Sequence, residues 1–319
     1  MDDQLQETYD VVVIGGGAAG LNGALMLARS RRAVVVVDAG APRNAPADGV
    51  HGLLGREGTP PAELLATGRA EVRRYGGQVV SGQVVAASRA GDQFTVRLAD
   101  GRSTRARRLL LAMGLTDELP DVPGLAERWG RDVLHCPYCH GWEVRDQAIG
   151  VLSSGPMSVH QALMFRQLSD DIVFFTHTTP PFAEDQLELL SARGVEIVDG
   201  AVTGLEVVDD RLTGVRLHDG TVVERDVVAV ATRMRANTEA VAGLGLHPVE
   251  HPNGVGQLLP ADPTGRTEVP GVWVAGNVTD LVAQVGGAAA AGASAGAQVN
   301  ADLVMEEAQR AVEARRSRA

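Results

Sequence analysis

Lysine is absent from this chain of 319 residues, and all 29 of its basic residues are arginine. Chemistry that needs a lysine, such as a Schiff base or the phosphate contact of a P-loop, is therefore excluded. Aromatic residues make up only 3% of the chain, while hydrophobic residues reach 45% and glycine occupies 38 positions. A large core of small apolar residues is typical of parallel α/β layers. The net charge of −11 argues against nucleic acid or an anionic membrane as a partner.

Long hydrophobic runs are also missing. The first apolar run, residues 11–14, is short and follows acidic residues, so it does not have the form of an export signal. No apolar stretch approaches the roughly 20 residues that a membrane span needs. Together with only two cysteines, these absences predict a cytoplasmic protein with no membrane partner.

The two cysteines stand three positions apart, in the sequence Cys-Pro-Tyr-Cys-His at residues 136–140. This spacing lets the sulfurs close a small disulfide ring, in which one thiol attacks a partner and the other resolves the product. The other interpretations are half of a zinc site and a structural bridge. A zinc site usually takes four ligands, for which the chain holds no second pair, and so short a disulfide loop stabilises little. Cys136 and Cys139 therefore predict redox chemistry and no metal.

The N-terminal segment predicts a dinucleotide-binding unit. Residues 9–14 form an apolar strand, residues 21–29 a helix, and residues 33–37 a second strand that ends at Asp38. The first strand and the helix are joined by the glycine loop, Gly15-Gly16-Gly17-Ala18-Ala19-Gly20. In this setting the first glycine permits a tight turn, the second lets the backbone approach a pyrophosphate, and the third allows close helix–strand packing. Asp38 stands where a carboxylate would hold ribose hydroxyls.

A second copy of the same plan follows, with strands at residues 149–152 and 172–175. Each copy leads into short strands around an Asp-Gly turn, at residues 100–101 and 219–220. In the second copy the glycine loop is replaced by what we call the serine loop, residues 153–158, with the sequence Ser-Ser-Gly-Pro-Met-Ser. The residues after its second strand supply neither an acid for a ribose nor an arginine pair for a 2′-phosphate. The second copy therefore predicts a retained fold without its NAD(P)H site.

This repeat predicts an α/β protein with two Rossmann-like dinucleotide-binding domains, each three-layered and each with a β-meander. The first domain is predicted to be discontinuous, at residues 1–116 and 248–319. The second, residues 117–247, is inserted into it and carries the cysteine pair at its start. The last helix is predicted at residues 286–305, and the polar tail after it is expected to be a frayed helix end.

These features resemble the low-molecular-weight thioredoxin reductases over nearly the whole chain. The glycine loop, the cysteine pair and the segment Gly-Val-Trp-Val-Ala-Gly-Asn-Val-Thr-Asp at residues 271–280 carry the resemblance. It implies FAD as the cofactor and a homodimer. Asn277 replaces the family's ribityl-binding Asp, and Gln284 stands at the position of the family's flavin-contacting Gln. The implied FAD-binding residues are Gly15, Gly17, Ala18, Ala19, Gly20, Asp38, Asn44, Ala112, Gly114, Gly276, Asn277, Gln284 and Val285.

More narrowly, residues 136–143, Cys-Pro-Tyr-Cys-His-Gly-Trp-Glu, are similar to the FAD-dependent dithiol oxidases of this superfamily. Those enzymes form disulfides in small natural products and pass the electrons to O2, giving H2O2. Thioredoxin reductases usually place an Asp where this chain has His140, and they keep the second glycine loop. The resemblance therefore implies a small dithiol and O2 as partners and argues against NAD(P)H. Two alternatives stay open: an NAD(P)H-dependent disulfide reductase and a non-catalytic flavin/dithiol redox sensor.

The resemblance also suggests catalytic roles. A substrate thiolate attacks Cys136, and Cys139 is the sulfur that faces the flavin in the family. His140 is the candidate acid/base, because its pKa range suits proton transfer with thiols, although it would equally cap the turn. His51 falls in the loop near the flavin, where it would line the substrate entry or lie on the surface. The remaining candidates are His135, expected to be structural, and Tyr138 and Trp142, expected to shape an apolar pocket unless Trp142 packs in the core.

Overall fold

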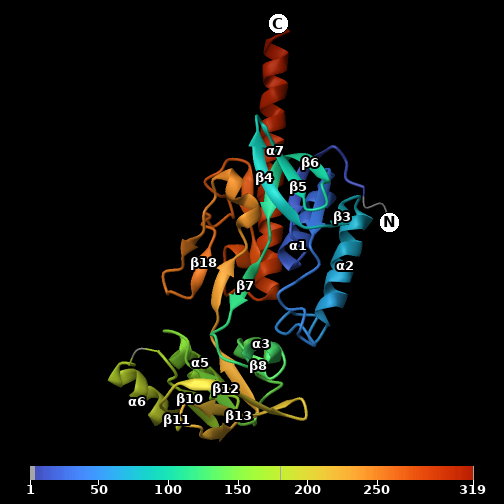
Figure 1. Ribbon diagram of the computed structural model, residues 1–319. Coiled ribbons are helices and arrows are strands. Elements are labelled where there is room, and N and C mark those ends of the chain that lie inside the picture. Colours follow the sequence, from blue (N-terminus) through green and yellow to red (C-terminus); the bar gives the residue numbers. More distant parts are fainter. Residues whose placement is uncertain (1–3, 180, 319) are drawn as a thin grey trace.

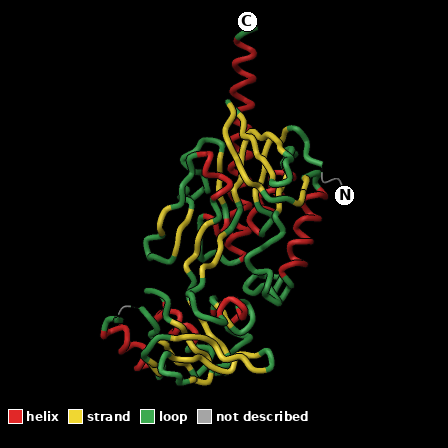
Figure 2. The backbone as a smooth tube through the Cα atoms, in the orientation of Figure 1, coloured by secondary structure: helices red, strands yellow, loops and turns green. Residues whose placement is uncertain are grey.

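The computed structural model describes residues 4–179 and 181–318; residues 1–3, 180 and 319, which fall in the predicted domains, lie outside the described residues. Figure 1 shows a larger first body and a smaller second body stacked end to end. The chain crosses between them through β7 (Leu115–Glu118) and β16 (Arg233–Ala236), which pair antiparallel. The tube in Figure 2 shows how narrow this junction is compared with either body.

The first body is built on a seven-stranded sheet in the order β3-β2-β1-β6-β5-β4, with β19 on the other side of β6. Strands β3, β2, β1, β6 and β19 run parallel, and β6 continues into the antiparallel meander β6-β5-β4. The valines of β1 and β2 are buried because both faces are covered. The bounds are β1 Thr8–Ile14, β2 Val34–Asp38, β3 Gln78–Ser81, β4 Val84–Ala90, β5 Gln93–Leu98, β6 Ser103–Leu111 and β19 Val272–Val274.

Three helices cover one face of this sheet: α1 (Ala18–Arg29), α2 (Pro61–Arg74) and α7 (Val285–Arg316). Helices α1 and α7 touch backbone to backbone, as Figure 1 shows from their side-by-side course. A Cβ built on Gly292 would lie 1.9 Å from the carbonyl oxygen of Ala19, and one on Gly296 would lie 2.6 Å from that of Gly23. The Ala- and Gly-rich composition of α7 therefore serves a contact that leaves no room for side chains.

The second body repeats this plan with a five-stranded parallel sheet in the order β11-β10-β9-β15-β8. An antiparallel meander, β12-β13-β14, forms a separate sheet that packs against it, whereas the first meander is joined to its sheet through β6. The predicted fold class is thus confirmed. The bounds are β8 Val133–Leu134, β9 Ile149–Leu152, β10 Ile172–Phe175, β11 Glu196–Val198, β12 Val202–Val208, β13 Arg211–Leu217, β14 Val222–Glu224, β15 Val227–Val230, α3 Leu125–Arg128, α4 Pro137–His140, α5 Ser158–Phe165 and α6 Glu184–Ala192.

The last helix is longer than predicted. Helix α7 runs to Arg316 rather than to residue 305, and its C-terminal end projects beyond the first body in Figure 1. The predicted fraying is therefore wrong for the described residues of the tail. Arg108 of β6 anchors the helix where this extension begins, because it pairs with Asp302 at 2.7 Å and with Glu306 at 2.5 Å.

The junction between the bodies is tied by one arginine from the connecting loop, which we define as residues 39–60 between β2 and α2. Arg43 donates two hydrogen bonds, of 2.6 and 2.7 Å, to the carboxylate of Asp117 in β7. Asp117 also accepts a hydrogen bond of 2.6 Å from the hydroxyl of Thr232, next to β16. Its side chain is only 6% exposed. The three residues therefore join both crossing strands to the first body.

The described residues place part of the predicted second domain in the core of the first body. The 3-10 helix η1 (Glu239–Leu244) packs on β4, and Val241 and Leu246 are buried together with Ala87. The sheet β17-β18-β16-β7 completes this side, with β17 at Val249–Glu250 and β18 at Gly256–Leu258. The boundaries at residues 116 and 247 stay a proposal, and these contacts support moving the second crossing back toward β16.

Within the described ranges, no helix combines the length and apolar character that crossing a membrane requires.

Candidate active site

The glycine loop leaves its backbone donors free. Gly15 has a φ of +107°, and a Cβ built on it would lie 2.2 Å from the carbonyl oxygen of Ala112, so only glycine fits. A Cβ on Gly20 would lie 1.9 Å from the carbonyl oxygen of Gly15, whereas one on Gly17 would meet open space. In the described part of the chain, the N–H groups of residues 16–20 have no acceptor. The start of α1 therefore presents a row of donors suited to an anion.

Asp38 ends β2 directly beside this loop. A Cβ built on Gly16 would lie 2.4 Å from Cγ of Asp38. The carboxylate accepts hydrogen bonds from the N–H of Gly40 at 3.0 Å and from Nη2 of Arg69 at 2.9 Å. Arg69 comes from α2, and the sequence analysis did not identify it. Because a carboxylate offers about four acceptor positions, Asp38 keeps capacity for ribose hydroxyls.

The second predicted FAD motif lies against the first. Gly276 begins the short helix η2 (Gly276–Val278) with a φ of +76°, and a Cβ built on it would lie 2.9 Å from Cβ of Ala19. The side-chain amide of Asn277 donates to the carbonyl oxygens of Asp280 and Ala283, both at 2.9 Å. An aspartate at this position has no such donor. Asn277 therefore shapes the turn that leads to the start of α7.

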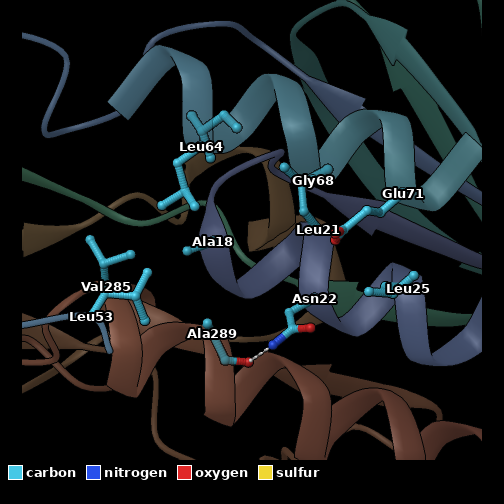
Figure 3. Close-up of a pocket in the computed structure, with 11 residues that line it drawn as sticks. Ala18, Leu21, Asn22, Leu25, Leu53, Leu64, Gly68, Glu71, Val285 and Ala289 are labelled. Carbon is cyan, nitrogen blue, oxygen red and sulfur yellow. Dashed lines mark hydrogen bonds between the residues drawn. The ribbon is translucent and has the colours of Figure 1, made fainter. Parts of the chain in front are cut away.

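The start of α7 brings the remaining predicted contacts together. Gln284 caps the helix, and its Oε1 would lie 3.3 Å from a Cβ built on Gly52 of the connecting loop. An apolar pocket opens beside it between α1, α2 and α7, and Figure 3 shows the side chains of Ala18 and Val285 pointing into it together with Leu53. Sequence reasoning missed this pocket, because it is assembled from three segments far apart in the chain.

The other predicted FAD-binding residues lie around the end of β6. Ala112 is 9% exposed and packs against Gly15. Gly114 has a φ of +67°, and its carbonyl oxygen accepts the N–H of Asn237 at 3.1 Å. Asn44 is half-buried in the connecting loop, next to Arg43. The free N–H groups, the open space at Gly17 and the carboxylate of Asp38 fit the pyrophosphate and ribose of the dinucleotide that the resemblance implies.

The serine loop, by contrast, satisfies part of its own backbone. The hydroxyl of Ser158, at the start of α5, accepts the N–H groups of Ser154 at 3.0 Å and Gly155 at 3.3 Å. The hydroxyl of Ser154 donates to the carbonyl oxygen of Ala231 at 2.5 Å. Pro156 has no N–H to offer. The donors that an anion would use at the head of this loop are therefore occupied by a side chain that is itself fully buried.

At the described end of β10, equivalent to the position of Asp38, the strand is followed by Thr176 and His177 in place of an acid. Thr176 donates a hydrogen bond of 3.1 Å to Asp199. His177 has a φ of +53°, and its Nδ1 accepts the N–H of Val202 at 3.0 Å. Burial lowers the pKa of His177, which keeps the ring neutral in this role. The predicted loss of a ribose carboxylate in the second copy agrees with these contacts.

The cysteine pair forms a disulfide at α4, with 5.3 Å between the two Cα atoms. Cys136 caps this short helix, and both cysteines are half-buried. Tyr138 and Trp142 flank the pair and are 68% and 66% exposed, so Trp142 is not part of the core. The guanidinium of Arg145 lies 4.3 Å from the ring centroid of Trp142. The disulfide therefore lies beside an exposed aromatic surface.

His140 follows Cys139 at the end of α4. Its Nε2 is buried, and within the described residues it has no hydrogen-bond partner, so the ring does not cap the turn through this atom. Burial lowers the pKa of His140; the charges of Glu143 and Asp48 act to raise it, and that of His51 acts to lower it. A neutral imidazole with an unused nitrogen can accept a proton from a thiol.

His51 lies where the connecting loop meets the segment that follows the cysteine pair. Its Nδ1 is 2.6 Å from Oε1 of Glu57, and its Nε2 is 3.5 Å from Oε1 of Glu143. A second contact lies nearby, where a Cβ built on Gly130 would be 2.6 Å from Cβ of Pro46. That the loop of His51 lies near the flavin stays a prediction, and the two glutamates gave no signal in the sequence, because their spacing is not that of a known motif.

His135 precedes the pair and is largely buried. Its Nδ1 lies 3.2 Å from the carbonyl oxygen of Val230, and its own carbonyl oxygen accepts Nε2 of Gln161 at 2.6 Å. Burial, with the nearby charge of Arg43, lowers the pKa of His135. These contacts support the structural role expected for it.

Comparisons with known proteins agree with this geometry. The family model described as pyridine nucleotide-disulphide oxidoreductase matches residues 9–313. The chain is 32% identical to "Thioredoxin reductase tcpT" of Claviceps purpurea, with 93% of this chain and 95% of the relative covered. It is 31% identical to "Thioredoxin reductase sirT" of Leptosphaeria maculans, covering 92% and 93%. The solved structure "Crystal structure of HlmI" superposes with a TM-score of 0.92 at 47% identity, covering 99% of both chains.

Proposed function

Because the chain belongs to the pyridine nucleotide-disulphide oxidoreductase family, we propose that this flavin-dependent oxidoreductase is a dithiol oxidase. It closes a disulfide in a small dithiol through Cys136 and Cys139, and the electrons pass through FAD to O2, giving H2O2. The observation that carries the proposal is the contrast between the two loops. The glycine loop keeps its donors free for FAD, and Ser158 occupies those of the serine loop, where NAD(P)H would bind.

FAD is the cofactor of this family, and the residues that would hold it are the glycine loop, Asp38, and the segment from Gly276 to Val285. The bound flavin supplies a two-electron acceptor that returns the two thiols of the enzyme to the disulfide. The protein's own contribution is to hold the disulfide, to position His140 and to admit the substrate.

The thiol chemistry balances as a double exchange. A substrate thiolate attacks Sγ of Cys136, the Cys136–Cys139 bond breaks, and Cys139 leaves with the electron pair. The second substrate thiolate then attacks the substrate sulfur of the mixed disulfide, and Cys136 leaves. The substrate loses two electrons and two protons, and the enzyme gains the two electrons as a dithiol. His140 accepts a substrate proton at its unpaired Nε2, which raises the fraction of thiolate.

The surroundings of the disulfide support a small, partly apolar substrate. Tyr138 and Trp142 expose aromatic surface beside it, which an apolar or cyclic ligand can cover. Oxygen consumption with dithiothreitol as a stand-in substrate tests the proposal. We expect turnover that Cys136→Ser abolishes, whereas oxygen uptake that survives this substitution contradicts the dithiol route.

A second candidate is an NAD(P)H-dependent disulfide reductase, which the names of the relatives favour. The two functions differ in the anaerobic reaction of the oxidised enzyme with NADPH or NADH. The oxidase proposal predicts no bleaching of the flavin absorbance at micromolar nucleotide and rapid bleaching by dithiothreitol. Rapid bleaching by nucleotide overturns the oxidase proposal, and a flavin that responds to neither supports a redox sensor. We further propose that the protein is cytoplasmic and that it is a homodimer. Sedimentation of the purified holoenzyme tests the homodimer.

A further inference from the structure

The connecting loop touches both the candidate FAD site and the second body. Near its end, Oε1 of Gln284 would lie 3.3 Å from a Cβ built on Gly52, at the start of α7. The neighbouring His51 lies 3.5 Å from Glu143, which belongs to the second body. Earlier in the same loop, Arg43 binds the crossing strand β7. The loop therefore links the place where a flavin would be held to the body that carries the disulfide.

Buried polar contacts continue from Arg43 to the residue before the disulfide. Asp117 accepts two hydrogen bonds from Arg43 and one of 2.6 Å from the hydroxyl of Thr232. The side chain of Asp117 is 6% exposed, and Thr232 is 5% exposed. Nδ1 of His135 lies 3.4 Å from the backbone N of Thr232 and 3.2 Å from the carbonyl oxygen of Val230. One tautomer of the ring accepts from Thr232 and the other donates to Val230, so either one ties the ring to the end of β15.

The backbone that leads into the disulfide is held as well. Leu134 pairs with Ala229 in the parallel ladder of β8 and β15. The carbonyl oxygen of His135 accepts Nε2 of Gln161 at 2.6 Å, and Gln161 is buried in α5. Cys136 follows directly. Its position is therefore set by the end of β15 and not by a free loop.

The proposed reaction requires the thiols of the second body to meet a flavin held by the first. As the cysteine pair closes to the disulfide it gives two electrons and two protons to that flavin, and a misplacement of about 1 Å can slow such a step by roughly a hundredfold. We propose that Arg43 is a positioning residue for flavin reduction. Through Asp117 and Thr232 it sets the place of His135, and with it that of the cysteine pair, relative to the flavin-binding body. This inference rests on the proposed function.

The test separates two steps in the anaerobic reaction of the oxidised holoenzyme with dithiothreitol. Acid quenching, alkylation and mass spectrometry follow the opening of the enzyme disulfide, and absorbance follows the bleaching of the flavin. In Arg43→Ala we expect bleaching to slow about tenfold or more while the disulfide opens at the wild-type rate, so that enzyme thiols accumulate before the flavin bleaches. Thr232→Val should act in the same direction but less, because the pair of Arg43 with Asp117 remains.

The matched control is Arg235→Ala, which removes exposed ion pairs from the same small sheet and should leave both rates unchanged. Arg43→Lys keeps the charge but cannot make two parallel hydrogen bonds, so it should restore only part of the bleaching rate.

A general loss of stability predicts a different result. Hydrogen exchange of the oxidised holoenzyme gives a readout that needs no turnover. In Arg43→Ala the amides of residues 133–141 should exchange faster, while those of the central strand β9, residues 149–152, should keep their wild-type rates. Equal slowing of disulfide opening and bleaching, or faster exchange throughout the second body, overturns the inference.

The same measurements separate the two proposals. If dithiothreitol neither opens the wild-type disulfide nor bleaches the wild-type flavin, the proposed function fails whatever Arg43 does. If both steps are fast in the wild type and every variant matches it, dithiol oxidation stands and the positioning role of Arg43 is wrong.

Discussion

The glycine loop and the serine loop occupy equivalent places in the two bodies, each between the first strand and first helix of its unit. Each has a glycine facing open space, at Gly17 and at Gly155. They differ in what the backbone donors do: those of residues 16–20 have no acceptor in the described chain, while Ser158 accepts two in the serine loop. The fold alone therefore does not create a dinucleotide site. Whether the N–H groups are still available decides it.

The difference extends to the end of the next strand. In the first body this position holds the carboxylate of Asp38, which accepts a hydrogen bond from Arg69. In the second body it holds His177, whose Nδ1 accepts the backbone N–H of Val202. Under the proposed function, the second body has no nucleotide to deliver by turning toward the other body. The clamp of Arg43 on Asp117 at the junction is consistent with a fixed arrangement of the two bodies.

The sharpest test of the comparison is a matched pair of substitutions at the two open glycines. Gly17→Val should weaken FAD binding more than a thousandfold, about 4 kcal/mol, because the side chain fills the space that the pyrophosphate needs. Gly155→Val should change neither flavin content nor oxidation of dithiothreitol. Flavin absorbance of the purified proteins and titration of the apoproteins with FAD measure both. Equal losses in the two variants would break the comparison.

The junction provides the next largest effect. Arg43→Ala should lower the free energy of unfolding by about 3 kcal/mol, because it leaves the buried carboxylate of Asp117 without its charge partner. Arg235→Ala, which removes exposed pairs with Glu118 and Glu239, should cost no more than about 1 kcal/mol. Urea denaturation of both holoproteins checks this. Similar losses would mean that Arg43 does not clamp the junction.

The pH dependence of stability follows from the same pair. Burial acts to raise the pKa of Asp117, but the hydrogen bonds and charge of Arg43 outweigh it and leave the pKa below its usual value. The stabilisation is therefore present above the unfolded-state pKa of about 3.9 and is lost as pH falls through the lower folded-state pKa. In Arg43→Ala this acid dependence should shrink. A wild-type dependence in the variant would rule out Arg43 as its cause.

A smaller effect concerns catalysis. Because burial lowers the pKa of His140, its imidazole stays neutral at neutral pH, and the bleaching rate should fall only below pH 6.5, toward about tenfold per unit. His140→Gln should lower the rate and remove this acid limb. His177→Asn, which suits the left-handed backbone at the serine-loop side, should leave the limb unchanged. Loss of the acid limb in His177→Asn instead would assign the titration to His177 and not to His140.

The smallest expected effect is at the serine loop itself. Ser158→Ala removes the acceptor of two backbone N–H groups and should cost about 1 kcal/mol of stability, as the loss of a helix cap does. Freed donors should also permit weak binding of NADH, measured by quenching of its fluorescence. Stability unchanged within error would show that these hydrogen bonds do not hold the loop.

Local signals made the fold and half of the site predictable. The run of valines before Gly15, the spacing of the three glycines and Asp38 at the end of the next strand all lie within one stretch of chain, where spacing determines geometry. The cysteine pair could be recognised for the same reason, because its two members are only three positions apart. The changed residues of the second copy could also be located, because they stand at the same intervals as those of the first copy.

The rest of the site depends on contacts between distant segments. Arg69 reaches Asp38 from 31 positions away, Arg43 reaches Asp117 across 74, and Glu143 meets His51 from the other body. The packing of the bodies decides which arginine pairs with which carboxylate. The periodicity of the sequence does not predict these pairs. The length of α7 was missed for a similar reason, since Arg108, which pairs with Asp302 and Glu306, belongs to β6.

The contact between α1 and α7 has one more consequence. Because Gly292 and Gly296 allow the two backbones to touch, neither helix can slide or tilt without colliding with the other. The starts of these helices lie at the two ends of the candidate FAD site, one at the glycine loop and one at Gln284. The helix pair therefore keeps a constant distance between the contacts for the two halves of a long cofactor, whatever the position of the second body.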